Sequence, residues 1–442
     1  MRVLEFNRNT PCVVPIPYYV GGGIEENLLS FLVARNAYPD QIKSELKDVG
    51  ASRLDDIAGH ISFLINIFEQ EGISYLEATY ETLSQVIKSL YEDEEWKGSS
   101  LIIYAGSWRL FYTYLTKINV SHNMVMPKKL KVSSKARKDD QFLSHTPGSI
   151  NYYDNDRETM VPTEYLIFTD DYREKVISMD QWFELYSYLY EEDPVYAIMA
   201  ATMLQTFLRI GGVFQFPMAP TKQNPKWKRY AQLKQGSKSF QELNYIKKGQ
   251  RRAKCLVHLC TMELIENEYM KPFHKERRSL YESKYVKSKH AKNKVRTVKD
   301  KFLWLNKNGT PVSKKELQAV FIKASEALGF DVTAHSMRHT GATQLLWLYS
   351  EQHKVTLDVK QSSSIHVWLK KQLGHASIET TEHYIRTVNR LESEDVIAEM
   401  LPTALPTSIE KMNLPDEYLV IMKRAIKQNE IFFRGIDYDE AA

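Results

Sequence analysis

The sequence between positions 333 and 343 reads Thr333-Ala334-His335-Ser336-Met337-Arg338-His339-Thr340-Gly341-Ala342-Thr343. A second cluster lies downstream and consists of Leu373-Gly374-His375, Thr380-Thr381 and Tyr384. The apolar spacing around these clusters predicts helices over 336–349 and 364–373, the second ending at Gly374. Histidine, arginine and tyrosine are thus concentrated on, or at the ends of, successive helices.

These histidines do not have the pattern of a typical metal site. His335 and His339 have the i, i+4 spacing of a zinc-protease helix, but Ser336 stands where that chemistry needs a glutamate base. No cluster of cysteines or carboxylates lies nearby in the sequence to complete a ligand set. We therefore expect neither a metal nor another cofactor.

Two upstream segments complete an ordered pattern. They are Thr206-Phe207-Leu208-Arg209-Ile210 and the stretch from Phe302-Leu303-Trp304 to Gly309-Thr310-Pro311-Val312-Ser313. Together with the two clusters above, they resemble the boxes of the phage-integrase family of tyrosine recombinases, over residues 50–390 or so. The resemblance implies a mainly α fold. It would consist of an N-terminal helical core-binding domain of the SAM-like type and a mixed, mainly α catalytic domain with a small β-sheet.

The resemblance also implies catalytic residues for breaking a DNA phosphodiester. Arg209 and Arg338 would clamp the phosphate, because guanidinium groups bind phosphate oxygens bidentately and keep their charge. Tyr384 would attack the phosphorus and form a 3′-phosphotyrosyl intermediate without metal or ATP. His335 and His375 would donate to the phosphate or help to move the phenol proton.

The lysine that protonates the leaving oxygen normally sits on a hairpin turn in this family. Ile246-Lys247-Lys248-Gly249 is the nearest match, and Lys248 is the predicted general acid. Lys247 and Lys254 are alternatives, and Lys289 and Lys294 are more remote ones. Two further features depart from the family pattern. Gly212 replaces an acid usually found three residues after the first arginine, and the loop between His339 and His375 is extended through 350–364.

Basic residues are concentrated in blocks although the net charge is only +4. From Lys222 to Lys254 there are eleven Lys and Arg against one acid, and from Lys275 to Lys301 eleven against three. Blocks of this kind occur on solvated loops, but they also bind polyanions by releasing counterions from phosphates. The predicted DNA-binding residues are Lys128, Lys129, Lys131, Lys226, Lys228, Arg229, Lys287, Lys289, Lys292 and Lys294.

Apolar spacing and composition divide the chain into five predicted segments. They are an N-terminal arm (1–45), a helical core-binding DNA domain (46–120), a basic and polar linker (121–175), the catalytic domain (176–390) and an acidic C-terminal extension (391–442). Apolar stripes such as Ile57, Ile61 and Leu64 predict three or four helices between 50 and 118. In the catalytic segment, capping boxes begin helices at Ser178 and Ser313. A helix from Val195 is expected to run through Arg209 to Gly211-Gly212, and a small hairpin is expected around 256–259.

Cysteine content and hydropathy bear on the compartment. Cys12, Cys255 and Cys260 are too few for a disulfide framework or a four-cysteine zinc site, which favours a reducing compartment. The N-terminus lacks the apolar core of a signal peptide, and the most apolar stretch, 195–208, is too short and too interrupted to span a membrane. We expect a cytoplasmic, nucleoid-associated protein of a bacterium, phage or mobile element.

The resulting hypothesis is a site-specific DNA recombinase of the integrase or transposase type. Its partners would be duplex DNA carrying a recombination site, other copies of itself in a synaptic tetramer, and accessory proteins. The segment after Tyr384 would either dock on a neighbouring copy or pack on its own domain. The alternatives are a topoisomerase-like enzyme that works alone, a catalytically inactive DNA-binding protein of the same fold, and a helical scaffold that does not bind DNA. The last leaves the basic blocks unexplained.

Overall fold

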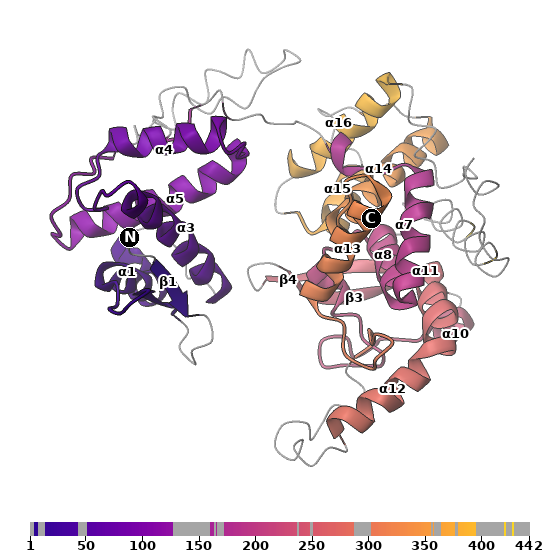
Figure 1. The fold of residues 1–442 in the computed structure, drawn as a ribbon. Helices are drawn as coiled ribbons and strands as arrows, with labels where there is room; N and C mark the ends of the chain where they lie inside the picture. The colour runs from indigo at the N-terminus through magenta and orange to yellow at the C-terminus, as the bar shows by residue number, and fades with distance from the viewer. Residues whose placement is uncertain are drawn as a thin grey trace. The chain divides into compact units, whose positions relative to one another are not determined.

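The computed structural model describes residues 4–7, 14–42, 51–126, 160–162, 165, 172–236, 238–247, 251–286, 302–354, 357, 364–375, 379–394, 420 and 427. The chain forms two compact units, unit 1 (Met1–Phe168) and unit 2 (Thr169–Ala442). Figure 1 shows helices predominating in both units. Each unit has its own apolar core, and each is described here by itself.

Unit 1 is a helical domain with one small hairpin. Its elements are β1 (Leu4–Asn7), β2 (Ile16–Tyr19), α1 (Glu26–Ala37), α2 (Pro39–Ile42), α3 (Ala51–Gln70), α4 (Tyr80–Glu92) and α5 (Gly98–Lys117). The predicted stripes form the core, since Ile57, Ile61 and Leu64 of α3 are buried together with Trp108 of α5. The indole Nε1–H of Trp108 donates to the carbonyl oxygen of His60 at 2.7 Å, which satisfies the one polar group of this buried ring.

The segments predicted as arm and linker take part in this packing where they are described. Leu28 and Phe31 of α1 are buried in the same core as α3 and α5, so this part of the predicted arm is built into unit 1. From the predicted linker, Met160 and Val161 are buried there too, while Tyr172 packs in unit 2. Apolar side chains scattered through a polar stretch drive this burial, and a reading based on average composition overlooks them. The remaining boundaries of the five-segment division stay predictions.

Unit 2 is built around α8. Its helices are η3 (Arg173–Lys175), α7 (Met179–Glu192), α8 (Pro194–Thr206), α9 (Ile210–Val213), α10 (Tyr230–Gln235), α11 (Leu259–Leu264), the π-helix η4 (Ile265–His274), α12 (Lys275–Tyr281), η5 (Glu282–Val286), α13 (Lys314–Leu328), α14 (Ala334–His353), α15 (Ser364–Leu373) and α16 (Glu379–Ser393). Every residue of α8 from Val195 to Thr206 is buried, and α8 is central among the surrounding helices (Figure 1). The predicted capping boxes at Ser178 and Ser313 are both present.

The sheet of unit 2 is a single antiparallel hairpin. Strand β3 (Phe240–Lys247) pairs with β4 (Arg251–His258) from Phe240 opposite His258 to Lys247 opposite Arg251. The hairpin is longer than the one predicted around 256–259. The sequence did not indicate the added length, because the residues near its turn, such as Lys247 and Arg251, are basic rather than apolar. The mainly α fold with small β-sheets is confirmed. Within the described ranges, no helix is both long and apolar enough to cross a membrane.

The helix predicted from Val195 through Arg209 was wrong at its end. It stops at Thr206, because Phe207 adopts a left-handed conformation (φ 57°, ψ 20°), and Gly211 and Gly212 lie in the separate short helix α9. A left-handed residue with a side chain costs roughly 1–2 kcal/mol. The Phe207 side chain is fully buried, which offsets this cost. The break points the chain at Arg209 in a new direction.

Helices α8 and α14 approach each other closely at Gly341. A methyl group built on Gly341 would lie 2.0 Å from the carbonyl oxygen of Leu204 and 3.0 Å from the Phe207 ring. Only glycine permits this approach, which brings the backbone of Phe207 next to the helix that carries Arg338. This contact prepares the geometry of the candidate site.

Candidate active site

Several of the predicted catalytic side chains gather around Arg338, and this group is called the cluster below. Arg338 itself is almost completely buried, with 1% of its surface exposed. Its Nη1 donates to the carbonyl oxygen of Phe207 at 2.7 Å, and its Nη2 donates to the carbonyl oxygen of Leu373 at 2.8 Å. One guanidinium thus joins the ends of α8 and α15 to α14. Burial lowers the pKa of Arg338, yet a guanidinium remains charged at neutral pH. The structure therefore places a fixed cation where three segments meet.

His375 is bound directly to this cation. Nη2 of Arg338 donates to Nε2 of His375 at 2.9 Å. Because a guanidinium only donates, the ring proton of His375 is on Nδ1, which lies 3.0 Å from Oγ1 of Thr381. Burial lowers the pKa of His375 to about 3, and the positive charges of Arg338, Arg209 and Lys247 act in the same direction. His375 is therefore neutral at pH 7, in a tautomer that Thr381 holds.

Tyr384 lies in the same cluster, on α16, with 1% of its surface exposed. Its ring stacks with that of His339 at 5.4 Å and that of His375 at 6.1 Å between centroids. Burial raises the pKa of Tyr384 to about 12, although Arg338 and Arg209 both act to lower it. The phenol thus faces both arginines of its own chain and stays protonated until its surroundings change.

The two histidines of the first cluster occupy different environments. His335 is at the start of α14, and the residue as a whole is exposed. Desolvation of its ring is the largest cause that lowers its pKa to about 4, and the charges of Arg338 and Arg209 act in the same direction. His339 is 3% exposed, and burial lowers its pKa to about 2. Neither ring nitrogen of His339 has a hydrogen-bond partner among the described residues. Its ring lies 4.4 Å from that of His335.

Arg209 is exposed, at the N-terminus of α9. It lowers the pKa of Tyr384, His335 and His375 by its charge, so it lies near all three. The backbone N–H of Gly212 donates to the carbonyl oxygen of Arg209 at 2.7 Å, and a methyl group at Gly212 would meet the Leu208 side chain at 2.9 Å. A side chain at Gly212 would therefore press on the end of the Leu208 side chain.

The lysine prediction falls on a residue outside the described ranges, since Lys248 comes directly after the last residue of β3 in the sequence and is not described. Its neighbour Lys247 is described, and its Nζ donates to the carbonyl oxygen of Gly374 at 2.9 Å, directly beside His375. Lys254 instead pairs with Glu242 across the strands at 2.9 Å. Lys289 and Lys294 lie outside the described ranges. Of the two lysines that the structure describes here, Lys247 is the one that lies at the cluster.

Two glutamines hold the hairpin beside the cluster, and sequence reasoning did not identify them. The amide of Gln215 accepts from the backbone N–H of Ile246 and donates to its carbonyl oxygen, both at 2.8 Å. The amide of Gln372 bonds Leu256 of β4 in the same way, at 2.8 and 2.9 Å. Gln215 therefore links the Arg209 segment to the strand of Lys247, and Gln372 links the His375 segment to β4. For Gln372, the sequence offers one signal of a functional position, its place just before Leu373-Gly374-His375. For Gln215, it offers none.

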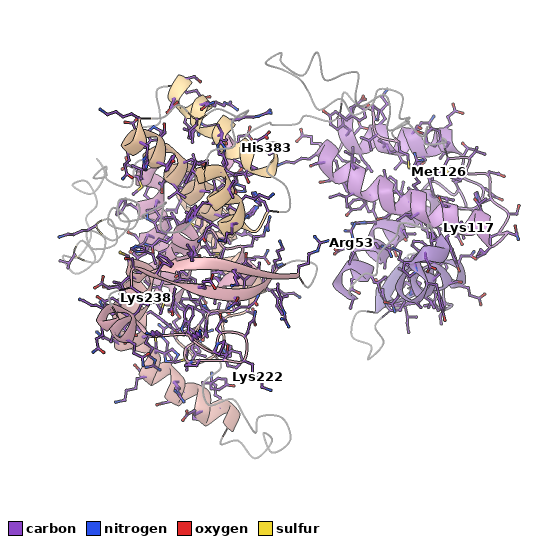
Figure 2. The ribbon with its side chains drawn as sticks, turned by 180° about the vertical axis from the view of Figure 1, so that it is seen from behind. Arg53, Lys117, Met126, Lys222, Lys238 and His383 are labelled. Atoms are coloured by element: carbon purple, nitrogen blue, oxygen red, sulfur yellow. The ribbon has the colours of Figure 1, made fainter. Side chains whose placement is uncertain are left out.

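The predicted DNA-binding residues are partly described. Lys226, Lys228 and Arg229 are exposed on the segment before α10, as is Lys222, which is labelled in Figure 2. The other predicted DNA-binding residues are outside the described ranges: Lys128, Lys129, Lys131, Lys287, Lys289, Lys292 and Lys294.

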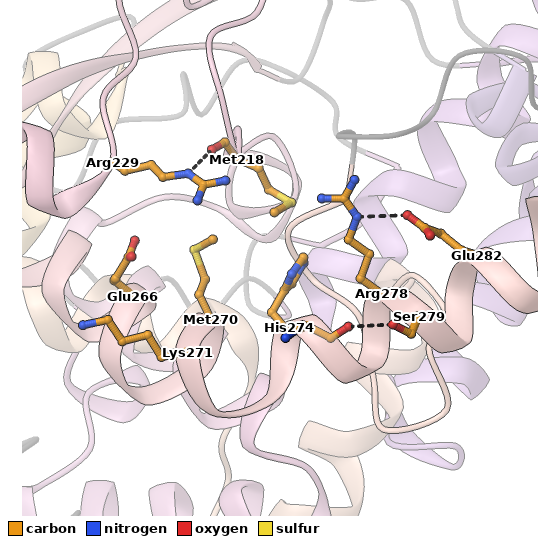
Figure 3. A pocket seen from close by; sticks show the side chains of 10 residues that line it. Met218, Arg229, Glu266, Met270, Lys271, His274, Arg278, Ser279 and Glu282 are labelled. Carbon is orange, nitrogen blue, oxygen red and sulfur yellow. Dashed lines mark hydrogen bonds and ion pairs between the residues drawn. The ribbon is translucent and has the colours of Figure 1, made fainter.

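Arg229 also lines a cavity of about 520 Å³ that is separate from the Arg338 cluster (Figure 3). The cavity lies against η4 and α12, and both of its arginines have partners. Arg229 donates to the carbonyl oxygen of Met218 at 3.3 Å, and Arg278 pairs with Glu282 at 3.2 Å. In the described parts of the chain, no group of three or more His, Cys, Asp or Glu side chains is placed to hold a metal ion.

Comparisons with known proteins were made against families, curated proteins and solved structures. The model described as "Phage integrase family" matches residues 266–390. No curated protein matches. Similar solved structures include XerH site-specific recombinase bound to palindromic difH substrate in a post-cleavage complex, with 14% identity, TM-score 0.45, and coverage of 85% of this chain and 90% of that one.

Two further structures have comparable similarity. XerH bound to difH substrate in a pre-cleavage complex has 13% identity, a TM-score of 0.43, and coverage of 84% of this chain and 94% of that one. XerA recombinase has 14% identity, a TM-score of 0.31, and coverage of 84% and 98%. The family match spans the segment that carries His335, Arg338, His375 and Tyr384, so this segment is similar to the phage integrase family.

Proposed function

We propose that this protein cuts and rejoins duplex DNA at a specific site, with Tyr384 as the nucleophile. The observation that carries the proposal is the convergence of Arg338, His375 and Tyr384, whose sequence clusters lie far apart, around one buried guanidinium. The similarity of residues 266–390 to the phage integrase family supports the same chemistry. A decayed homologue would be expected to lack at least one of these side chains.

The proposed reaction is a transesterification. The phenol oxygen of Tyr384 forms a bond to phosphorus, and the bond from phosphorus to the 5′ oxygen breaks. The protein is then covalently linked to the 3′ phosphate of the cut DNA strand. The phenol proton must leave, because the pKa of about 12 keeps Tyr384 protonated at pH 7. Neutral His335 can accept this proton, and a bound phosphate raises its pKa by opposing the charge of the arginines. His375 has no free lone pair for it, since its Nε2 accepts from Arg338 and its Nδ1 carries the ring proton. Reversal by another strand's 5′ hydroxyl joins two DNA molecules without ATP.

The environment of Arg338 supports phosphate binding. Its Nε is buried and has no partner among the described residues, although its other nitrogens are bonded. Buried donors in native proteins are almost always satisfied, so an unmet N–H of a cation points to a missing anionic acceptor. Exposed Arg209 could add a second fork from the solvent side.

Lys247 is our proposed general acid, in place of Lys248. Lys247→Ala should slow cleavage of a normal phosphodiester by about 10²–10⁴-fold, the usual contribution of a positioned acid. A substrate with sulfur in place of the 5′ oxygen should be cleaved nearly as fast by this variant as by the wild type, because a thiolate leaves without protonation. Single-turnover rates on the two substrates measure the effect.

Lys248→Ala and Lys254→Ala serve as matched controls for that experiment. Both should cut the oxygen and sulfur substrates in the same ratio as the wild type. Sulfur rescue confined to Lys248→Ala would return the role to Lys248, and no rescue in any of the three would reject a lysine acid on this hairpin.

The test of the function needs a substrate found without assuming activity. A duplex library with a randomised central segment is enriched by binding to Tyr384→Phe, which should bind but not cut. The enriched duplexes are then synthesised with a nick near the centre. Cleavage beside the nick releases a short fragment, so the cut strand cannot be rejoined and the covalent adduct is trapped. Wild-type protein should give a covalent adduct that survives denaturation, and Tyr384→Phe should give none. Adduct formation by Tyr384→Phe, or its absence for wild type on every enriched duplex, would contradict the proposal.

The partners remain part of this proposal. The XerH structures contain DNA substrates, and the exposed Lys222–Arg229 segment suits a phosphate backbone. We propose a synaptic tetramer with accessory proteins, acting in a bacterial, phage or mobile-element setting in the reducing cytoplasm, where the free buried thiols of Cys255 and Cys260 are stable. Light scattering with and without enriched duplex tests the tetramer, and relaxation of a supercoiled plasmid without joining would instead indicate a topoisomerase-like enzyme.

A further inference from the structure

The nucleophile helix α16 is held by a segment that enters unit 2 ahead of α7. We call residues 172–177 the strap. The backbone N–H of Tyr172 donates to Oγ1 of Thr387 at 2.7 Å, one turn beyond Tyr384. Arg173 pairs with Glu394 at 2.9 Å, just beyond the end of the same helix. The strap therefore binds α16 at two points that both lie C-terminal to Tyr384.

The strap also binds α14, which carries Arg338. The backbone N–H of Ile177 donates to Oγ1 of Thr340 at 3.2 Å, next to His339. Val176 is buried against Leu391 of α16. One short segment thus fixes the distance between the helix of the phenol and the helix of the arginine.

The ring of Tyr172 fills the space between these two helices. It lies 4.0 Å from the ring of His339 and 4.7 Å from that of Tyr384, between centroids. It also lies 5.6 Å from His383, which Figure 2 labels on α16. The two ring nitrogens of His339 make no hydrogen bond within the described residues, so stacking alone holds that ring. Tyr172 and His339 thus form an aromatic wall against the phenol of Tyr384.

We infer that Tyr172 is a positioning residue for the nucleophile, and this inference rests on the proposed function. The Tyr172 ring keeps Tyr384 beside Arg338 and out of water, so that the phenol oxygen reaches the phosphate in line. Displacement of a reacting group by about 1 Å can reduce a rate by about 10²-fold, so a side chain that does no chemistry can control the rate. The ring, rather than the hydroxyl, carries this role, since every contact named above is to the ring or the backbone.

The experiment compares Tyr172→Phe with Tyr172→Ala in adduct formation on the enriched nicked duplexes. Tyr172→Phe should react within about threefold of the wild type, while Tyr172→Ala should react about 10- to 100-fold more slowly. The DNA affinity of both variants should equal that of the wild type. Thr387→Val, which removes the acceptor of the Tyr172 N–H without changing volume, should show the same direction of change with a smaller effect, and it tests the strap if Tyr172→Ala does not fold.

A pH profile separates positioning from general loss of structure. Burial is the largest cause of the raised pKa of Tyr384, so removing the Tyr172 ring should hydrate the phenol and lower that pKa from about 12. The rate of Tyr172→Ala should then begin to level off at a lower pH than that of the wild type, although the rate itself is lower. A partly unfolded protein would lose amplitude with no such displacement of the profile.

Tyr188→Ala is the control, because Tyr188 packs on α7 outside the cluster. It should leave both the rate and the pH profile unchanged. A Tyr172→Ala variant with the wild-type rate and profile would overturn the inference while leaving the proposed function intact. Absence of adduct for the wild type would instead reject the proposed function.

Discussion

Arg338→Lys is expected to lower the rate of covalent adduct formation by at least about 10²-fold, the effect of removing one preorganised donor from a developing oxyanion. The guanidinium binds the carbonyl oxygens of Phe207 and Leu373 and Nε2 of His375 at the same time, at 2.7–2.9 Å. An ammonium group keeps the charge but has no planar fork, so it cannot make these three hydrogen bonds in the same directions and offer a further N–H to phosphate. Single-turnover kinetics on enriched nicked duplexes measure the rate.

Arg278→Lys is the matched control for Arg338→Lys. Arg278 pairs with Glu282 and is separate from the cluster, so the same substitution should leave the rate of the bound complex unchanged. Circular dichroism on heating should show that Arg338→Lys is folded at the assay temperature. A rate within about threefold of the wild type would contradict the role of Arg338 as a geometric clamp.

Gly341→Ala is expected to lower the free energy of unfolding of unit 2 by about 3 kcal/mol or more, at the upper end of overpacking costs. The added methyl group would meet the carbonyl oxygen of Leu204 at 2.0 Å, and a backbone atom inside a buried helix cannot rotate away. Any relief requires α8 and α14 to separate, which would also move Phe207 from Arg338. Stability should therefore fall together with the rate of adduct formation.

Gly211→Ala is the comparison for Gly341→Ala. A methyl group at Gly211 would meet nothing within 4 Å, and the residue lies in helix α9, where alanine is favoured. Thermal denaturation of this variant should match the wild type or occur at a slightly higher temperature. Equal stability of Gly341→Ala and Gly211→Ala would show that the helices can part at little cost.

The residues that could be located from the sequence are those whose spacing is short and local. His335 and Arg338 are three residues apart in α14, so helix geometry nearly determines their relation. His375 precedes Tyr384 by only nine residues and lies shortly before α16, which carries Tyr384. The structure adds that the carbonyl oxygen of Phe207, far upstream, accepts from Arg338. That contact depends on a left-handed residue and on Gly341, and neither has a periodic signature.

The residues that were missed act through contacts distant in sequence. Lys247, which the sequence offered only as an alternative, bonds the carbonyl oxygen of Gly374, and the face to which such a strand residue points depends on the strand register, since successive side chains point to opposite faces. Tyr172 lies in a stretch whose composition indicated a linker, and its partner Thr387 is 215 positions away. Gln215 pairs with Ile246 through an amide, for which no sequence pattern exists.

These amide pairs also limit how copies of the chain can associate. Gln215 and Asn224 bond backbone groups along the outer edge of β3, and Gln372 does so along β4. An open strand edge is a template for β-augmentation by another polypeptide, but here those edge positions are already saturated by side chains. A neighbouring copy thus cannot add a strand to the hairpin at Ile246, Asn244 or Leu256. A contact between copies made elsewhere would leave these edge bonds, which hold the hairpin beside the cluster, in place.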